Sequence, residues 1–336
     1  MMPFISIKFI AAGVIAVPIS KIITNIIWNF LPKRFISELE EKAVLITGCD
    51  SGFGNELAWK LDGRGMTVYA GCLYPSGQGA LRLINNCSNR LVILHLDISK
   101  DQLVQDAVNT VNHTLGNKKL WAVVNNAGVP ESGELEWIKS SACQEMINVN
   151  TIGAYRVTQT FLPLLRRSAG RVVIVTSVLG QVSTPGAGPY CMSKHALTSF
   201  ADSLRREMLK WNVTVHTVEP WMYDTSISEE KRLFEIVEKN WTTSPQIVHE
   251  DYGEEYVKEF KNSLQKILKY SRPQSKIYEV VDEMEHATIG TNPKIRYVPG
   301  LVGQFWIGLL NTVPTELLDL VTYMTSPKNI KFQQES

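Results

Sequence analysis

The chain has 336 residues, which is long enough for one α/β domain of roughly 250 residues plus extensions. Its net charge of +1, with Lys and Arg scattered along the sequence, gives no reason to expect a nucleic acid as a partner. Five cysteines without paired spacing argue against a disulfide framework and against a metal site.

The N-terminal segment, residues 1–35, is strongly apolar from Phe4 to Leu31. Pro18 and Lys21 interrupt it, and a lysine near the bilayer centre costs about 2.5–3.5 kcal/mol on insertion scales. We expect this segment to associate with a membrane, as a kinked or tilted anchor or as an interfacial segment. A mitochondrial transit peptide is disfavoured, because such peptides are rich in Arg and Ser. The basic pair that follows, at positions 33 and 34, favours a cytosolic catalytic domain.

A glycine-rich turn follows the first predicted strand, Ala43–Thr47, and a helical pattern then begins. Together with a second strand at Thr67–Cys72, this makes a βαβ unit of the kind that binds dinucleotides. Gly48 permits the tight turn, and Gly52 lets the backbone approach a pyrophosphate at the helix N-terminus. The residues of this unit that we predict to contact the cofactor are Thr47, Gly48, Asp50, Ser51, Gly52, Phe53, Gly54 and Cys72.

The end of the second strand normally selects the cofactor, because an acidic residue there binds the ribose 2′-hydroxyl and an arginine accepts a 2′-phosphate. This chain has Cys72 and Leu73 at that place, so neither signal is present. In the glycine turn, Asp50 would repel a 2′-phosphate and Ser51 adds no positive charge. The sequence therefore favours NAD over NADP.

Polar and small residues also follow the next two predicted strands. Asp97 closes the strand Leu91–Leu96 and has two interpretations: a partner for the adenine amino group, or the residue that begins a helix before Ser99. The strand Trp121–Val124 runs into a short polar and glycine-containing stretch that suits close approach of a nucleotide. The contacts predicted from this stretch are Asn125, Ala127 and Gly128.

Asn150 lies in the middle of a helical pattern that runs from about residue 141 to residue 166. An asparagine inside a helix is mildly unfavourable. One explanation is a solvated side chain, and the other is a helix distortion at this point that holds a water.

Tyr190 and Lys194 are spaced by one helical turn, so both side chains emerge on one face of the predicted helix. A phenol has an unperturbed pKa of about 10, and a nearby ammonium is expected to lower it. Ser177, near the end of the preceding strand, can hydrogen-bond the same substrate oxygen. These residues are suited to moving a proton off an alcohol or onto a carbonyl.

Strands and helices alternate as far as the sixth strand, Val213–Val218, which predicts a single-domain α/β fold with a Rossmann-type, doubly wound parallel sheet. Residues 221–275 break this alternation and carry several aromatic side chains. We interpret them as a helical substrate lid within a catalytic domain of residues 40–300, the alternative being a surface insertion with its own apolar cluster. The last strand is expected at Tyr297–Val298. Residues 301–336 form an apolar extension, expected to close the pocket and touch the membrane.

Together these motifs resemble the short-chain dehydrogenase/reductase family over residues 42–225. The flanking sequences are similar to the branch that holds the membrane-bound retinol dehydrogenases, the hydroxysteroid dehydrogenases and 3-hydroxybutyrate dehydrogenase. Within that branch, the stretches Glu250–Gly253 and Asn292–Gly300 are most similar to the type 2 17-beta-hydroxysteroid dehydrogenases.

The resemblance implies a role for each site residue. Tyr190 is the general base in oxidation, Lys194 lowers its pKa and holds the nicotinamide ribose, Ser177 orients the substrate oxygen, and Asn150 supports a water relay to Lys194. Both Pro220 and Thr225 lie at the nicotinamide. The family usually has Pro-Gly after the sixth strand, whereas this chain has Trp221 in place of the glycine, which puts the shape of the substrate pocket in doubt.

The leading interpretation is an NAD-dependent dehydrogenase of a steroid or retinoid alcohol, held at the endoplasmic reticulum membrane. A second is a mitochondrial 3-hydroxybutyrate-type enzyme, for which basic residues such as Lys231 and Arg232 would bind the carboxylate. A third is a catalytically silent protein that binds nucleotide or lipid and acts as a scaffold. The resemblance also implies a homodimer formed through the helices that carry Asn150 and Tyr190.

Overall fold

The computed structural model describes residues 32–225 and 227–325. Within these residues seven strands form one sheet, in the order β3-β2-β1-β4-β5-β6-β7, and all neighbours pair in parallel. The strands are β1 Lys42–Thr47, β2 Thr67–Cys72, β3 Leu91–His95, β4 Lys119–Asn125, β5 Arg171–Val175, β6 Thr214–Val218 and β7 Arg296–Tyr297. The strand order reverses between β1 and β4, and such a reversal is where a parallel sheet binds its ligand. The predicted Rossmann-type fold is confirmed.

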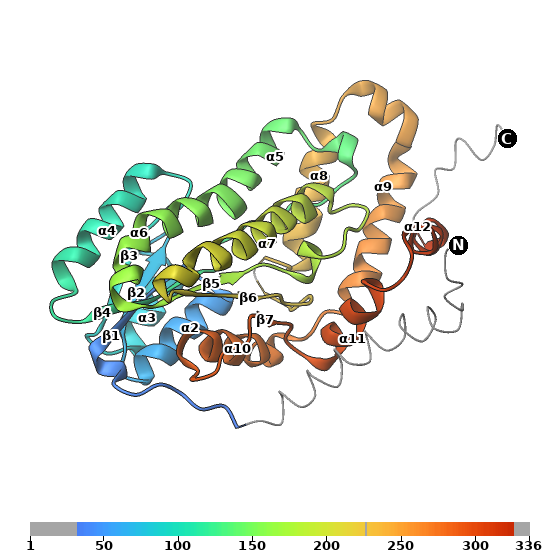
Figure 1. The fold of residues 1–336 in the computed structure, drawn as a ribbon. Coiled ribbons are helices and arrows are strands. Elements are labelled where there is room, and N and C mark those ends of the chain that lie inside the picture. Colours follow the sequence, from blue (N-terminus) through green and yellow to red (C-terminus); the bar gives the residue numbers. More distant parts are fainter. Residues whose placement is uncertain (1–31, 226, 326–336) are drawn as a thin grey trace, which may run out of the picture.

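Helices cover both faces of the sheet (Figure 1). One face is covered by α4 Asp101–Thr114, α6 Ala154–Ser168 and α7 Gly188–Met208, and the other by α2 Gly52–Gly63, α3 Gln78–Asn86 and α10 Tyr278–Ile289. The remaining helices are α5 Ser140–Ile147, α8 Glu230–Thr242, α9 Gln246–Leu268, α11 Leu301–Leu310 and α12 Thr315–Thr325.

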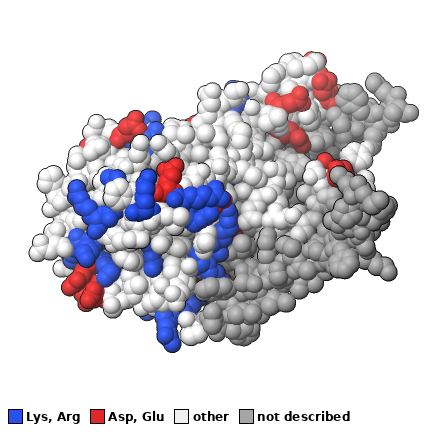
Figure 2. All heavy atoms as spheres, viewed as in Figure 1, with Lys and Arg blue, Asp and Glu red and all other residues white. Residues whose placement is uncertain are grey.

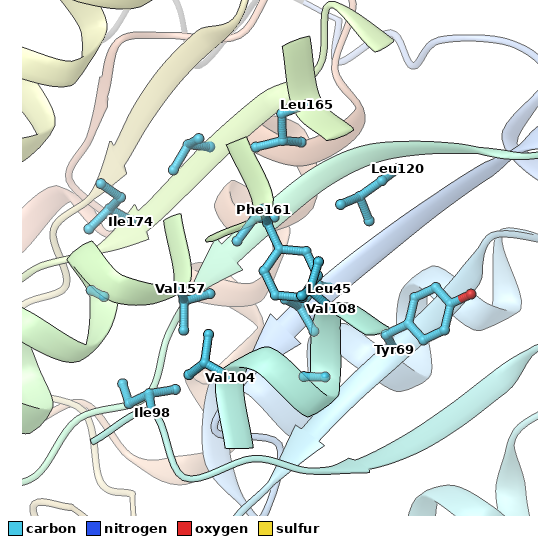
Figure 3. Packing of buried hydrophobic residues seen from close by; sticks show 14 of the residues in the cluster. Leu45, Tyr69, Ile98, Val104, Val108, Leu120, Val157, Phe161, Leu165 and Ile174 are labelled. Carbon is cyan, nitrogen blue, oxygen red and sulfur yellow. The ribbon is translucent and has the colours of Figure 1, made fainter. Parts of the chain in front are cut away.

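The two-sided cover explains why the strands are apolar throughout. In β1, Leu45 packs into the core under α4, α6 and α7, while Val44 and Ile46 pack into the core under α2 and α10. Figure 3 shows the first core, where Phe161 of α6 lies among side chains from the strands and from α4. A polar residue at an inner strand position faces one of these cores, so the buried polar side chains of the strands are hydrogen-bonded, as Arg171 of β5 is.

A buried arginine ties β5 to the end of α10. The guanidinium of Arg171 donates to the carbonyl oxygens of Ala287, Thr288 and Gly290 at 3.2, 3.1 and 2.7 Å. It also stacks on Trp121, with its central carbon 5.1 Å from the ring centroid. These carbonyls lie at the C-terminal end of α10 and in the residue that follows it, and Trp121 Nε1 also donates to the Thr288 carbonyl at 2.8 Å. Carbonyls at a helix C-terminus lack partners inside the helix, so a cation there satisfies them and opposes the helix dipole.

Most predicted elements are present, with shifted ends. The last strand is Arg296–Tyr297, one residue earlier than expected. The long helix expected from about residue 141 to residue 166 is divided into α5 and α6 by a π-helical segment, Asn148–Gly153. The expected membrane segment falls largely on residues 1–31, outside the described residues. In the part of the chain that is described, no helix combines the length and the apolarity of a membrane span.

The lid and the tail gather at one end of the molecule, away from α3 and α4 (Figure 1). Helix α9 is interrupted at Gly253, whose φ of 75° is not helical. Figure 2 shows acidic side chains grouped on the projecting part of α9, whereas Lys and Arg gather on the other half of this face.

We predict that Arg171→Met lowers the free energy of unfolding by about 2–4 kcal/mol, because the carbonyls of Ala287 and Gly290 lose their donor and that of Thr288 keeps only Trp121. Urea unfolding followed by circular dichroism measures this change. The exposed Arg167 of α6 supplies the control, since Arg167→Met is expected to change stability by less than about 0.5 kcal/mol. Equal effects of the two substitutions would contradict the role given to Arg171.

Candidate active site

The turn after β1 approaches the loop after β4 so closely that it admits only glycine. Gly48 has φ +70°, and a Cβ there would lie 2.8 Å from the Cα of Ala127. A Cβ on Gly54, in the first turn of α2, would lie 2.4 Å from the carbonyl oxygen of Gly48. This packing brings the N-terminus of α2, with its unpaired N–H groups, to the carboxyl edge of the sheet.

The hydroxyl of Thr47 joins the same two loops. It accepts the backbone N–H groups of Asn126 and Ala127, each at 3.0 Å. The side chain of Asn126 in turn donates to the carbonyl oxygens of Thr47 and Gly48, also at 3.0 Å. The sequence drew attention to Asn125 rather than to Asn126, yet the Asn125 side chain donates to Thr158 of α6 at 2.8 Å. The β-strand alternation of side chains across Asn125 and Asn126 is the signal that distinguishes them.

The carboxylate of Asp50 lies against the end of β2. It accepts the backbone N–H groups of Leu73 and Tyr74, each at 2.9 Å. Cys72 is buried behind this contact, and burial raises the pKa of its thiol to about 12. The cavity wall at the end of β2 is therefore formed by Leu73 and Tyr74, which were not among the predicted cofactor contacts, rather than by Cys72, which was.

Asp97 precedes a turn rather than a helix. Its Oδ1 accepts the backbone N–H of Ser99 at 2.9 Å and so closes a turn ahead of α4, which begins only at Asp101 with Lys100 as its N-cap. Its side chain is partly exposed, and the residue lines the same cavity as the glycine turn.

Ser177, Tyr190 and Lys194 come together at the carboxyl ends of β5 and β6. Ser177 and Tyr190 line the same cavity, and the Ser177 hydroxyl is placed to hydrogen-bond the phenol and lower its pKa. The Nζ of Lys194 lies 5.7 Å from the ring centroid of Tyr190 and donates to the carbonyl oxygen of Val175 at 3.2 Å. The three side chains that the sequence placed in one reaction are thus neighbours in the fold.

Burial controls the proton affinities of this group. It lowers the pKa of Lys194 to about 8. It raises the pKa of Tyr190 to about 12, and the hydrogen bond from Ser177 opposes that rise. The expected lowering of the Tyr190 pKa by Lys194 is not found, because the Nζ of Lys194 lies over the phenol ring and burial dominates. At neutral pH Tyr190 is a neutral phenol beside a largely protonated lysine.

Asn150 lies inside the π-helical segment, so the helix distortion anticipated there is confirmed. Its side chain is fully buried, accepts the N–H of Val129 at 2.8 Å, and donates to the carbonyl of Val129 at 3.0 Å and to the Oγ of Ser193 at 3.1 Å. A Cβ on Gly128 would lie 3.3 Å from its Oδ1 and 3.7 Å from the Nζ of Lys194. Asn150 therefore fixes the loop after β4 next to the catalytic lysine.

The segment after β6 forms the next wall. The carbonyl oxygen of Pro220 accepts the N–H of Val178 at 3.1 Å, and the N–H of Thr225 donates to Ser228 at 3.1 Å. Trp221 packs against α11, where a Cβ on Gly303 would lie only 3.2 Å from the Cβ of Trp221. The indole is accommodated because position 303 has no side chain.

One cavity of about 1300 Å³ unites these groups. Of the predicted site residues, it is lined by Gly48, Asp50, Ser51, Gly52, Phe53, Asp97, Ala127, Gly128, Ser177, Tyr190, Lys194, Pro220 and Thr225. Five others, namely Thr47, Gly54, Cys72, Asn125 and Asn150, brace the walls from behind. The volume exceeds the roughly 300–1,000 Å³ of ordinary ligand pockets, so a dinucleotide and a second large molecule both fit.

One surface of the predicted lid, residues 221–275, lines this cavity, and another builds an aromatic cluster outside it. Phe260 and Leu264 of α9 line the cavity. Trp241, Tyr252 and Tyr256 instead surround Trp137, a fully buried side chain from the loop after β4. Both interpretations of this segment, a lid and a separate apolar cluster, therefore describe part of it.

Residues 42–235 match the family model described as short chain dehydrogenase. The chain belongs to this family. It is 40% identical over 300 residues to retinol dehydrogenase 16 of Mus musculus, covering 89% of this chain and 93% of that one. It is 38% identical over 301 residues to 17-beta-hydroxysteroid dehydrogenase type 6 of Bos taurus, covering 89% and 93%. These relatives support the retinol and hydroxysteroid branch, but not the type 2 enzymes in particular.

Solved structures of low sequence identity share the fold. A short-chain dehydrogenase from Streptomyces avermitilis superposes with a TM-score of 0.66 at 21% identity, covering 87% of this chain and 100% of that one. One from Burkholderia phymatum, in complex with NAD, has a TM-score of 0.64 at 20% identity, covering 87% and 98%. With the relatives above, they identify the chain as an NAD(P)-dependent oxidoreductase that interconverts alcohols and carbonyls.

We predict that Gly48→Ala lowers the free energy of unfolding by more than about 1 kcal/mol, because alanine is strained at this positive φ. It also weakens binding of NAD, since the turn must move away from Ala127. Thermal unfolding and a fluorescence titration with NAD measure the two effects.

Gly63→Ala is the matched control, because nothing lies within 4 Å of the Cβ that it adds near the end of α2. It is expected to leave NAD binding unchanged and to stabilise the helix by up to about 1 kcal/mol. Similar losses in both variants would contradict the close approach at Gly48.

Proposed function

We propose that this protein is an NAD-dependent dehydrogenase of a lipophilic alcohol, of the steroid or retinoid class, in which Tyr190 is the general acid/base. The observation that carries the proposal is the placement of Ser177 next to Tyr190, with Lys194 beside it, in the wall of a cavity large enough for cofactor and substrate together. The names of the relatives, retinol dehydrogenase and 17-beta-hydroxysteroid dehydrogenase, support the substrate class.

The residues of the cavity divide the chemistry among them. When bound, NAD would supply the hydride acceptor. Tyr190 first gives up its phenolic proton, and as the phenolate it takes the hydroxyl proton as the carbonyl forms, while Ser177 holds the oxygen in place. Because burial favours a neutral phenol, the proton must leave Tyr190 again, and Lys194 with the adjacent Asn150 region supplies the route.

The glycine turn, the N-terminus of α2, Asp97, Ala127–Gly128 and the segment Pro220–Thr225 would hold the cofactor. The space kept free by Gly48 and Gly54 fits a pyrophosphate beside a helix N-terminus. Cys72 and Asn125 would support these contacts from behind.

Asp50 is the main support for NAD over NADP. Its carboxylate already occupies the N–H groups of Leu73 and Tyr74, the donors at the end of β2 that a 2′-phosphate would need. It also places a negative charge there, and like charges repel by several kcal/mol when solvent is partly excluded.

We predict that Asp50→Asn shifts the ratio of kcat/KM for NAD to kcat/KM for NADP toward NADP by about tenfold, since the charge is lost while an acceptor oxygen remains. Initial rates with both cofactors on one alcohol measure the ratio. Asp106→Asn, on the exposed side of α4, is expected to leave it unchanged. A wild-type preference for NADP would contradict the cofactor assignment.

The cavity walls favour a neutral, apolar substrate. Leu233, Phe260, Leu264 and Ile267 of the lid face it, and so do the carboxylates of the loop after β4, including Glu134. Burial raises the pKa of Glu134, which shows that this part of the cavity disfavours negative charge, and the carboxylate of a substrate would be disfavoured there as well. Arg232 also lines the cavity, whereas Lys231 lies at a separate surface hollow. The 3-hydroxybutyrate alternative therefore has less support.

The tail supports a membrane location. Phe305 and Trp306 of α11 and Leu320 of α12 are exposed, at 54%, 43% and 54%, and Thr322 of α12 lines the cavity. An apolar surface next to the cavity mouth suits entry of an alcohol from a bilayer. We propose the endoplasmic reticulum membrane as this location, with residues 1–35 as the N-terminal attachment. Exposed apolar residues at Ile152, in the π-helical segment that carries Asn150, and at Met192, in α7, support a homodimer through these two elements.

We predict that Tyr190→Phe lowers kcat for alcohol oxidation by a factor of about 10²–10⁴ and leaves the affinity for NAD unchanged, because only the proton-transfer group is removed. A panel of steroids, retinol and 3-hydroxybutyrate, assayed with NAD and NADP on membranes carrying the protein, measures the loss. Tyr270→Phe, at a site 78% exposed, is the control.

Unchanged turnover in Tyr190→Phe would refute the mechanism. A wild-type chain that binds NAD and oxidises none of these alcohols would favour the scaffold alternative instead.

A further inference from the structure

The short turn that follows Ser177 determines where its hydroxyl points. Residues Val178–Gly180 form one 3₁₀ turn, and the N–H of Leu179 donates to the Oγ of Ser177 at 3.1 Å. A Cβ on Gly180 would lie 2.8 Å from the carbonyl oxygen of Lys194, so the turn is pressed against α7. Any movement of this turn would move the Ser177 hydroxyl relative to Tyr190.

A buried carboxylate lies beside the end of this turn. Glu219, at the end of β6, is fully buried. Its Oε1 accepts the hydroxyl of Thr217 at 2.7 Å and the guanidinium of Arg296 at 2.9 Å, and its Oε2 accepts the side-chain amide of Gln181. A buried carboxylate is costly unless its oxygens are satisfied, so these donors are held in fixed positions.

The oxygen of the Gln181 side-chain amide contacts the end of α11. This atom, Oε1, accepts the side-chain Nδ2 of Asn311, the residue after α11, at 2.6 Å. Apolar contacts run alongside this bond, since Ile307 of α11 packs with Val178 and Val182. The amide donates to Glu219 and accepts from Asn311 at the same time, which neither a carboxylate, without a donor, nor an alkyl group of the same length can do.

We propose that Gln181 is a positioning residue: by bridging Glu219 and Asn311 it fixes the turn that aims the Ser177 hydroxyl at Tyr190, and it makes α11 part of the active-site framework. The proposal rests on the proposed role of Tyr190 as the base.

The consequence for catalysis follows from the Ser177–Tyr190 hydrogen bond. That bond holds the pKa of Tyr190 down against the rise that burial causes. If the turn loosens, the bond weakens and the pKa of Tyr190 rises further. Oxidation requires Tyr190 to give up its proton, so the acid limb of the pH–rate profile must move to higher pH.

The test compares Gln181→Met, which keeps the length and removes the amide, with the wild-type enzyme in NAD-dependent oxidation of the best alcohol substrate. The expected result is a fall in kcat of about tenfold or more, with the KM for NAD within about twofold and the acid limb displaced upward by about half a pH unit or more. Gln181→Glu sets a second carboxylate against Glu219, so it is expected to shift the profile in the same direction.

Asn311→Ala provides a second route, because Asn311 is exposed and the change leaves the Gln181–Glu219 bond in place. It is expected to give a smaller displacement in the same direction, and it decides the matter if the Gln181 variants do not fold. Gln105→Ala, on the exposed side of α4, is the control and should reproduce the wild-type profile.

A pH profile of Gln181→Met that superimposes on that of the wild type would overturn the proposal, even if the variant melts at a lower temperature. Unchanged turnover in Tyr190→Phe would overturn this proposal and the proposed mechanism together, so the two failures are distinguishable.

Discussion

The ammonium of Lys194 is held inside the protein, where water solvates it poorly, and much of the surrounding structure exists to allow this. Burial lowers the pKa of Lys194 to about 8, so the lysine is still mostly charged at pH 7 but loses its proton within about one pH unit above it. The carbonyl of Val175 accepts from its Nζ, Gly128 leaves room beside it, and Gly180 lets the serine turn pack against its backbone. A side chain at either glycine would disturb the charged group on which the proton transfer depends.

The sequence predicted the sheet and the reaction well because both are recorded in short, local patterns. Four apolar residues followed by Thr47 and Gly48 identify β1 and its turn, and the Tyr190/Lys194 spacing does not depend on where the helix ends. The details that escaped prediction depend on segments far apart in the chain. Which of Asn125 and Asn126 faces the glycine turn, and what Asp50 binds, follow from packing between β1, β2 and β4. The direction of the Tyr190 pKa shift required the depth of burial, which no spacing reveals.

The lid is attached to the catalytic half through the loop after β4. Trp137 leaves that loop and fills the centre of the aromatic cluster built by α8 and α9. The same loop contacts Asn150 through Val129. Its Glu134 accepts a hydrogen bond from the Tyr256 hydroxyl at 2.9 Å. The contacts of the segment 221–275 and of Asn150 thus share one short stretch of chain, so a change in how that segment packs can be transmitted to Asn150.

The contact between Trp221 and Gly303 limits how this sequence can diverge. The Cβ of Trp221, which carries the indole, stands 3.2 Å from where a Cβ on residue 303 would lie. Truncating the indole would leave a void, and a side chain at 303 would crowd the Cβ of residue 221, so substitutions at the two positions are coupled. Among descendants of this chain the two positions are therefore expected to covary. Residue 221 in the cavity wall and residue 303 in α11, more than eighty residues apart in the chain, are thus expected to change together.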